Sequence, residues 1–328
     1  MIRKWIAAAA LLLLALSLYA GRELPGYWAD YLSDRVEDIR ADIKKTGGQG
    51  ESFVFITDIH VPHNSMMSPS VIREVMAQTG VSRVIMAGDF MNAHATAKTG
   101  LDAMEKYLSR FSFTDPLVIR GNHDTNYVGY EIVSDTQFQA LVRKYSSKSY
   151  SNGDKMYYTL DDHRSRIRHI FLDTGDDNKK FVEKDQLLYL EKQIRSAPEG
   201  WHVAVFQHIS LRGQEAGKGI VNPGLYEDGR KVKAVLDKLC GKTRADIIGV
   251  FCGHSHTDFH MYSEAGYPII ATTCDSSGIQ ASYWDPRQPL RPAGTIHEAA
   301  FDVVTINTRR RMIFMKRIGA GVDRQYKY

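Results

Sequence analysis

The amino-acid sequence predicts an α/β fold in which helices pack on the outside of β-sheet. From Phe53 onward, short apolar runs typical of strands alternate with longer segments of helical periodicity. The last third of the chain is richer in strands than in helices, which suggests a second sheet packed on the first. With 328 residues and 43% hydrophobic content, the chain can bury a core of domain size.

The predicted strands are short and rich in branched and aromatic residues. They are FVFIT (53–57), RVIMA (83–87), PLVIR (116–120), IRHIFL (167–172), HVAVF (202–206), DIIGVF (246–251), YPIIAT (267–272), AAFDVVTI (299–306) and RMIFMKRI (311–318). Helical spacing is found at 27–45, 68–79, 101–111, 183–196 and 228–239. The first helix is amphipathic and is expected to pack on the domain, and the three glycines of KKTGGQGE then form a short linker.

The first twenty residues differ from the rest of the chain. Arg3 and Lys4 precede an apolar run from Trp5 to Ala20, which is the layout of a secretory signal peptide. The run is shorter than the roughly 20 apolar residues that span a bilayer, so we expect cleavage and export to the periplasm or the extracellular space. A retained signal anchor that holds the protein at a membrane is the alternative. The expected organisation is a signal segment at 1–20, a helix and linker at 21–50, and the main domain at 51–328.

Charge and cysteine content exclude several classes of protein. Without Arg3 and Lys4 the formal net charge falls from +4 to +2, so no specific nucleic-acid binding is expected. The three cysteines, Cys240, Cys252 and Cys274, permit at most one disulfide. Because Cys252 lies in an apolar strand, it is interpreted as a small buried hydrophobic residue and not as a catalytic thiol.

Five of the predicted strands end in polar residues that can bind a metal ion or move a proton. These residues are Asp58 and His60, Asp89 and Asn92, Asn122 with His123 and Asp124, His208, and His254 with His256. Ligands of open α/β sheets bind beyond the carboxyl ends of strands, so the five endings can converge on one place. Each alone is ordinary loop chemistry, but the five together predict a metal site.

The residue types in these endings also indicate the metals. Carboxylate, amide and imidazole ligands without thiolate suit Mn, Fe or Zn better than a structural zinc site rich in cysteine. The ligands are too many for one tetrahedral centre, so we expect two divalent or mixed-valence ions. Asp89 can bridge them because a carboxylate has two oxygens.

With these blocks in this order, the sequence resembles the calcineurin-like metallophosphoesterases. The resemblance rests on Asp-x-His, Gly-Asp-x-x-Asn, Gly-Asn-His-Asp, a histidine and Gly-His-x-His, and covers about residues 51 to 318. It implies two packed mixed β-sheets flanked by helices, an αββα sandwich. It also implies which residues hold which ion. Asp58, His60 and His256 would hold the first ion, Asn122, His208 and His254 the second, and Asp89 would bridge.

The same resemblance implies roles for residues that do not bind metal. His123 would face the substrate, Asp124 or a neighbouring carboxylate would orient the loop, and Asn92 would support the bridging carboxylate. Purple acid phosphatases are similar but carry a ligating tyrosine where this chain has Asn92 and a glycine where it has His60. The chain is therefore not expected to belong to that subfamily.

Other polar and aromatic residues near the motifs are given lesser roles. His63 and His94 are interpreted as loop residues at the rim of the site. Tyr127, Tyr283 and Trp284 could stack on a base or sugar, or serve local packing. The irregular segment YWDPRQPLRPAG (283–294) has the length of a functional lid, and the arginines at 309–311 are typical of a solvated hairpin turn.

The function expected from these patterns is that of an exported phosphoesterase with two metal ions. A hydroxide bridging the metals would attack the phosphorus of a phosphate mono- or diester, and His123 would protonate the leaving oxygen. The alternative is a non-catalytic envelope or cell-surface protein that keeps the metals for stability or to bind a phosphorylated partner. An unligated imidazole at position 123 favours the enzyme, because a structural metal site has no use for it.

Overall fold

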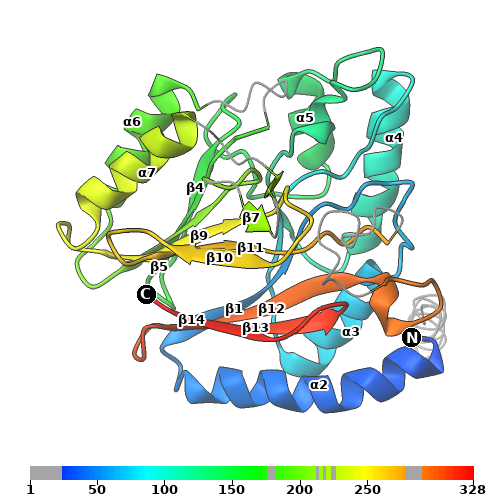
Figure 1. Cartoon of the computed structure of the whole chain (residues 1–328), viewed down its shortest axis with the longest axis horizontal. Helices are drawn as coiled ribbons and strands as arrows, with labels where there is room; N and C mark the ends of the chain where they lie inside the picture. Colours follow the sequence, from blue (N-terminus) through cyan, green and yellow to red (C-terminus); the bar gives the residue numbers. More distant parts are fainter. Residues whose placement is uncertain (1–23, 176–181, 212–213, 217–218, 223–226, 278–289) are drawn as a thin grey trace, which may run out of the picture.

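Two β-sheets packed face to face form the centre of the computed structural model. The structure describes residues 24–175, 182–211, 214–216, 219–222, 227–277 and 290–328. Each of the two large sheets has six strands, and helices lie on their outer sides (Figure 1). This confirms the predicted αββα sandwich. The signal segment predicted at 1–20 lies outside the described residues, and none of the helices within them is long and apolar enough to cross a membrane.

The first sheet joins strands from both ends of the domain, in the order β14-β13-β12-β1-β2-β3. Its strands are β1 (Gly50–Ile56), β2 (Val84–Met86), β3 (Leu117–Val118), β12 (Ala300–Asn307), β13 (Met312–Gly319) and β14 (Arg324–Lys327). The strands β1, β2 and β3 run parallel, whereas β12 pairs antiparallel with β1 in the register Val54↔Val303. The turn between β12 and β13 holds exposed arginines at 309–311, which confirms the predicted hairpin turn.

The second sheet is formed by the middle of the chain, in the order β10-β11-β9-β6-β5-β4. Its strands are β4 (Tyr158–Asp162), β5 (Ile167–Phe171), β6 (His202–Phe206), β9 (Asp246–Cys252), β10 (Phe259–Tyr262) and β11 (Pro268–Ala271). The four inner strands are parallel and the two edge strands are antiparallel to their neighbours. The strands β7 (Gln214–Ala216) and β8 (Gly219–Asn222) form a separate small hairpin.

The strand-rich last third does not form the second sheet by itself. The strands β12, β13 and β14 extend the first sheet, and the second sheet takes only β9, β10 and β11 from this part of the chain. Every residue of β12 is buried, because this strand lies inside the sheet beside β1. An apolar pattern indicates that such a strand is buried but does not indicate its partner.

The helices cover the two outer faces. They are α2 (Gly26–Lys45), α3 (Ser68–Thr79), α4 (Ala97–Leu108), α5 (Asp135–Val142), α6 (Lys184–Arg195) and α7 (Glu227–Leu239), with short 3-10 turns η1 (Ser109–Phe111), η2 (His123–Thr125) and η4 (Ile296–Glu298). The helices α2 and α3 lie under the first sheet, α6 and α7 lie over the second, and α4 and α5 stand side by side (Figure 1). The predicted helices are therefore confirmed.

The elements that the sequence patterns did not predict are mostly short and lie at edges. They are the helix α5 and the strands β4, β7, β8, β10 and β14. The burial of β10 alternates between half-buried and exposed residues, and β4 has one buried residue. Edge strands face solvent along one side, so they lack the apolar runs by which the inner strands were recognised.

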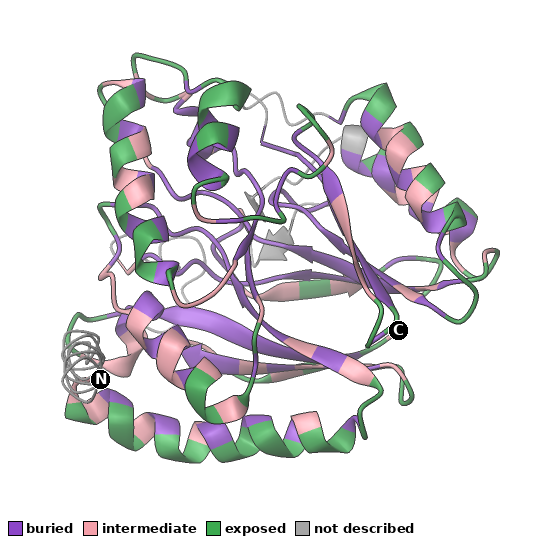
Figure 2. Ribbon diagram, turned by 180° about the vertical axis from the view of Figure 1, so that it is seen from behind, coloured by how far each residue is buried: buried purple, intermediate pink, exposed green. Residues whose placement is uncertain are grey.

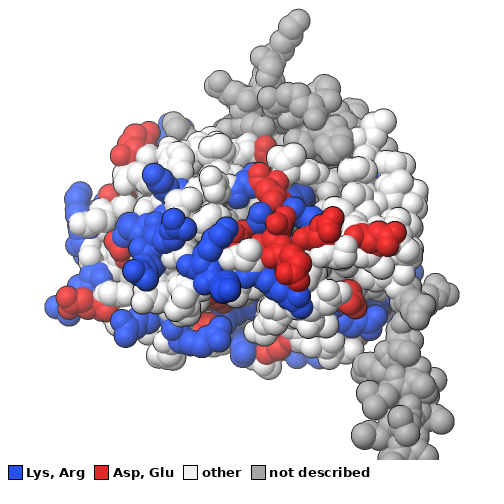
Figure 3. Space-filling view, turned by 90° about the horizontal axis from the view of Figure 1, so that it is seen from below, with Lys and Arg blue, Asp and Glu red and all other residues white. Residues whose placement is uncertain are grey.

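The helix α2 is amphipathic, as predicted. Its apolar stripe of Trp28, Leu32, Val36 and Ile39 is buried, whereas the opposite side is exposed (Figure 2). The face of the molecule that α2 covers carries charged side chains of both signs (Figure 3). Some of them pair along the helix, as the Nη1 of Arg40 and Oε1 of Glu37 do at 2.6 Å.

Aromatic side chains fill the space between the sheets and fix their relative position. Phe53 and Phe55 of β1 contact Phe206 of β6 and Phe251 of β9, with ring centroids 5.7 to 6.1 Å apart. Such pairs bury large apolar areas and constrain the geometry of the contact. As a result, the carboxyl ends of β1, β6 and β9 lie close together.

Candidate active site

Polar side chains from the ends of four strands come together in two overlapping clusters. Asp58, His60, Asp89 and His256 form the first, and Asp89, His208 and His254 form the second. The ligand atoms within each cluster all lie within 4.8 Å of one another. Asp89 belongs to both, so the structure brings six of the seven predicted metal ligands together around one shared carboxylate.

The backbone is strained at these residues. Asp58, His60, Asp89, His254 and His256 have φ values between 49° and 65°, in the left-handed region. They are half of the ten non-glycine residues with positive φ in the described part of the chain. Residues other than glycine adopt this conformation at a cost, and its concentration in one place is typical of functional sites.

Two glycines allow the loops that carry these residues to approach one another. A Cβ atom at Gly253 would collide with the Thr57 hydroxyl and the Asp58 carboxylate. A Cβ atom at Gly121 would collide with the Asp89 carboxylate. Glycine is therefore required at both positions for the strand ends to meet.

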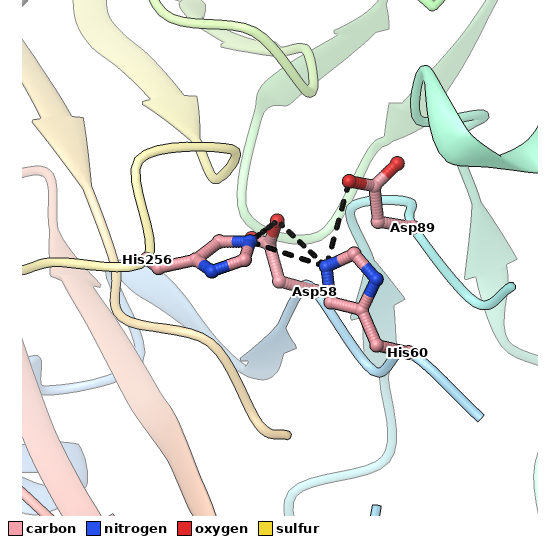
Figure 4. Close-up of side chains that lie close together, drawn as sticks. All are labelled: Asp58, His60, Asp89 and His256. Carbon is pink, nitrogen blue, oxygen red and sulfur yellow. Dashed lines mark hydrogen bonds and ion pairs between the residues drawn. The ribbon is translucent and has the colours of Figure 1, made fainter. Parts of the chain in front are cut away.

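Backbone carbonyls orient two of the histidines. The Nδ1 of His60 lies 3.1 Å from the carbonyl oxygen of Met91, and the Nδ1 of His208 lies 2.6 Å from that of Ala87. An Nδ1–H that donates to a carbonyl leaves the lone pair on Nε2, which is the usual preparation of a metal-binding imidazole. The Nε2 of His60 then faces the Nε2 of His256 at 3.1 Å (Figure 4).

The carboxylates complete an environment that attracts cations. The Oδ2 of Asp89 lies 3.2 Å from the Nε2 of His208 and 3.7 Å from the Nε2 of His60. The Oδ1 of Asp58 lies 3.2 Å from the Nε2 of His256, while its Oδ2 accepts hydrogen bonds from the Thr57 hydroxyl and the backbone N–H of His254. Each carboxylate therefore directs one oxygen into the cluster.

Asn122, the seventh predicted ligand, lies beside the clusters at the end of β3. It is buried, and its Oδ1 accepts no hydrogen bond from any described residue. A buried amide oxygen without a donor is costly, and a metal ion would satisfy it. The donor set thus fits two metal ions: Asp58, His60 and His256 would hold one, and Asn122, His208 and His254 the other, with Asp89 shared by both clusters.

The pKa of His208 also indicates that the buried carboxylates of the site favour a positive charge beside them. Burial opposes protonation of this imidazole, yet the carboxylates of Asp89 and Asp58 raise the pKa of His208 to about 10. The neighbouring histidines in turn hold the pKa of Asp89 well below its usual range despite burial. Two buried carboxylates this close require a compensating cation, which a proton or a metal ion can provide.

His123 and Asp124, the two predicted catalytic residues, lie in different surroundings. His123 is half-buried with its ring 5.0 Å from that of His60, and it belongs to neither cluster. Asp124 is fully buried and accepts hydrogen bonds from the backbone N–H groups of Asp89, Phe90, Met91 and Gly121 at 2.7 to 3.1 Å. Asp124 therefore orients the loops after β2 and β3 and has no oxygen directed toward a substrate.

A family match decides the assignment. The sequence model of the calcineurin-like phosphoesterase family matches residues 52–258, a range that includes every predicted metal ligand. The chain belongs to the calcineurin-like phosphoesterase family. This phosphoesterase is accordingly a metal-dependent hydrolase of phosphate esters with a dinuclear metal site.

Solved structures agree with the fold of this phosphoesterase. A dimetal phosphatase from Danio rerio is 15% identical with a TM-score of 0.60, over 85% of this chain and 99% of that one. A purple acid phosphatase from yellow lupin (Lupinus luteus) seeds is 13% identical with a TM-score of 0.52, over 85% of this chain and 54% of that one. Likeness at these identities concerns the fold alone. Among curated proteins, none matches this sequence.

Among the other residues near the motifs, Asn92 does not take its expected role, whereas His63 and His94 agree with their interpretation as loop residues. Asn92 makes no hydrogen bond to Asp89 within the described structure, and the Oδ1 of Asp89 instead accepts one from the backbone N–H of His123 at 2.8 Å. His63 and His94 belong to neither of the two clusters. Tyr283, Trp284 and most of the segment 283–294 lie outside the described residues.

The three cysteines are free thiols. Cys252 and Cys274 are buried, and burial raises the pKa of each thiol to about 12. A thiol with such a pKa stays protonated and unreactive near neutral pH. This agrees with the interpretation of Cys252 as a buried hydrophobic residue.

One residue that supports the site was missed by sequence reasoning. Asp173 follows β5, and its Oδ1 accepts a hydrogen bond from the Nε of Arg120 at 3.2 Å. Arg120 is 2% exposed and directly precedes Gly121 and Asn122. The pair therefore fixes the start of the loop that carries Asn122. The rule that found the other strand endings, applied to IRHIFL, would also have identified Asp173.

Proposed function

We propose that this phosphoesterase hydrolyses phosphate mono- or diesters with two divalent or mixed-valence ions of Mn, Fe or Zn, and that His123 acts as the general acid. The observation that supports this most is an unligated imidazole beside a carboxylate shared by two ligand clusters. When bound, the two ions supply a hydroxide nucleophile at neutral pH and neutralise the phosphoryl oxygens. A purely structural metal site has no need of His123.

The residues of the chain have separate tasks in this proposal. Asp89 would hold both ions, and its backbone N–H donates a hydrogen bond to the carboxylate of Asp124 at 2.9 Å. The backbone N–H of His123 donates a hydrogen bond to the Oδ1 of Asp89 at 2.8 Å, which ties the residue that carries the imidazole to the shared carboxylate. His123 donates its proton to the oxygen of the leaving group as the ester bond breaks.

Hydrolysis of aryl esters by metal-loaded protein tests the proposal. The protein is stripped of metal, reloaded with Mn, Fe or Zn, and assayed with nitrophenyl phosphate and bis(nitrophenyl) phosphate. We expect turnover that requires metal and that is lost in Asp89→Asn, a variant of nearly the same size. Metal binding without turnover of either ester class would favour the alternative of a non-catalytic binding protein.

We further propose that the protein is exported, on the basis of its first twenty residues. Arg3 and Lys4 followed by the apolar run from Trp5 to Ala20 support a signal peptide. Cell fractionation combined with mass spectrometry of the mature N-terminus is the test, with cleavage near Ala20 expected. An intact Met1 in a membrane fraction would support the anchor, and an intact Met1 on a soluble cytoplasmic protein would contradict export.

A further inference from the structure

A loop with several exposed apolar residues follows His123 in the sequence and begins at the candidate active site. We call residues 126–133 the Tyr130 loop. Its first aromatic residue, Tyr127, is half-buried with its ring 5.5 Å from that of His123. The hydroxyl of Tyr127 lies 3.5 Å from the Nδ2 of the predicted ligand Asn122. The loop therefore starts in contact with the reactive centre.

Hydrogen bonds hold the Tyr130 loop in a defined shape. The N–H of Val133 donates to the carbonyl of Thr125 at 2.9 Å and closes the loop at its base. The side chain of Asn126 spans its interior, donating to the carbonyl oxygens of Glu131 at 2.8 Å and His94 at 3.1 Å. The loop is thus fixed against the segment that follows β2.

The tip of the loop presents apolar side chains to solvent. Val128 is 45% exposed, Tyr130 93% and Ile132 53%. They are three of the seven large hydrophobic residues that are exposed in the described part of the chain, and they lie within five residues of one another. Single exposed hydrophobic residues are ordinary, but several together in one loop that starts at the reactive centre favour a binding surface.

We propose that the Tyr130 loop binds the leaving group of the substrate, and that this leaving group carries an apolar portion such as an alkyl chain or an aromatic ring. The inference rests on the proposed function. If His123 protonates the leaving oxygen, the leaving group emerges on the His123 side of the metals. The next residues along the chain are Tyr127 followed by Val128, Tyr130 and Ile132, which offer apolar contact. The charged residue among them, Glu131, accepts a hydrogen bond from the backbone N–H of Ala97 at 3.1 Å.

The dependence of activity on chain length tests this inference. Ethyl, butyl and hexyl phosphate, and the matching methyl alkyl diesters, differ only in the apolar leaving group. For the ester class that is hydrolysed, we expect kcat/KM to rise about two- to fourfold per added methylene, as partial to full burial of a CH2 group predicts. Turnover without any dependence on chain length would overturn the inference and leave the proposed function standing.

Variants of the loop tip test whether Tyr130 and Ile132 cause the dependence of kcat/KM on chain length. The double variant Tyr130→Ser with Ile132→Ser should keep the wild-type metal content but lose most of the rise in kcat/KM from the ethyl to the hexyl ester. The control is Leu188→Ser, which should leave the chain-length dependence unchanged. Leu188 is exposed like the loop residues, at 57%, but it lies on α6, on the outer side of the second sheet. An unchanged chain-length dependence in the double variant would refute the role of the loop.

Binding of ligands that cannot be hydrolysed separates the inference from the proposed function. Calorimetry of metal-loaded protein with ethylphosphonate and hexylphosphonate measures the apolar preference without turnover. We expect tighter binding of hexylphosphonate in the wild type and a reduced difference in the double variant. Equal affinities in the wild type would overturn the inference even if no ester were hydrolysed, whereas absent hydrolysis with this preference intact would count against the proposed function alone.

Discussion

The Nε2 atoms of His60 and His256 face each other at a distance of 3.1 Å. The Nδ1 of His60 is engaged by the carbonyl of Met91, so its lone pair is on Nε2 and points at the second imidazole. Two nitrogens directed at the same point between buried carboxylates favour a cation there. This contact joins the segments that follow β1 and β9, which lie 196 positions apart in the sequence.

The shared position of Asp89 predicts the metal content. Elemental analysis after reconstitution should give about two ions per mature chain, because the ligands fill two coordination spheres. Asp89→Ala should lose most of the bound metal and more activity than His256→Ala, since it disturbs both ions. A plateau near one ion in the wild type would show that Asp89 does not bridge.

Removal of the His123 imidazole should affect substrates according to their leaving group. General acid catalysis typically contributes about 10² to 10⁴-fold, and an alkoxide depends on it far more than a nitrophenolate does. His123→Ala should therefore keep its metal, lose much of its rate on alkyl esters and lose distinctly less on nitrophenyl esters. Metal loss in this variant would identify His123 as a ligand. Equal slowing of both ester types would mean that it stabilises the phosphoryl group instead.

The absence of a tyrosine at position 92 predicts the colour of the iron-loaded protein. Tyrosinate bound to ferric iron absorbs visible light, whereas Asn92 cannot form such a bond. Burial raises the pKa of the nearby Tyr127, which disfavours its tyrosinate form. Iron-loaded protein should show no strong purple band in its absorption spectrum. A band of this kind would refute the ligand assignment, and Tyr127→Phe would then show whether Tyr127 is its source.

A buried cluster of Asp302, Arg317 and Arg324 predicts how the free energy of unfolding depends on pH. Asp302 is fully buried, and Arg317 and Arg324 lower its pKa to about 2 against the effect of burial. Because the folded pKa lies below the ordinary value of about 3.9, the stabilisation is complete above about pH 4 and is lost as the pH falls toward 2. Asp302→Asn should cost about 3 kcal/mol at pH 7, since the buried guanidinium groups of Arg317 and Arg324 would then share the single carboxylate of Asp258.

Denaturant unfolding of wild type and Asp302→Asn between pH 7 and pH 2.5 measures this effect. The difference in unfolding free energy should stay constant down to about pH 4 and narrow below it. Asp102→Asn is the control, because its pair with Lys98 is exposed and should change stability little at any pH. A difference that persists undiminished at pH 2.5 would show that Asp302 does not act through its charge.

Sequence patterns alone identified the fold class, the inner strands and the ligand candidates. This succeeded because the carboxyl ends of parallel strands meet at one edge, so polar residues such as Asp58 and His208 could be assigned to one place without knowledge of their distances. The resemblance to the metallophosphoesterases implied that His123 is not a metal ligand, and His123 belongs to neither ligand cluster.

Tertiary structure alone decided which strands are neighbours and which polar groups support the ligands. The strands β12 to β14 belong to the first sheet, which the sequence could not show. Every strand offers the same backbone hydrogen bonds, so an apolar pattern does not identify the strand with which it pairs. Asp124, and not Asn92, fixes Asp89, because a carboxylate at position 124 reaches four N–H groups from two loops at once. Local sequence specifies which groups a loop offers, but only the packing of distant loops determines which of those groups meet.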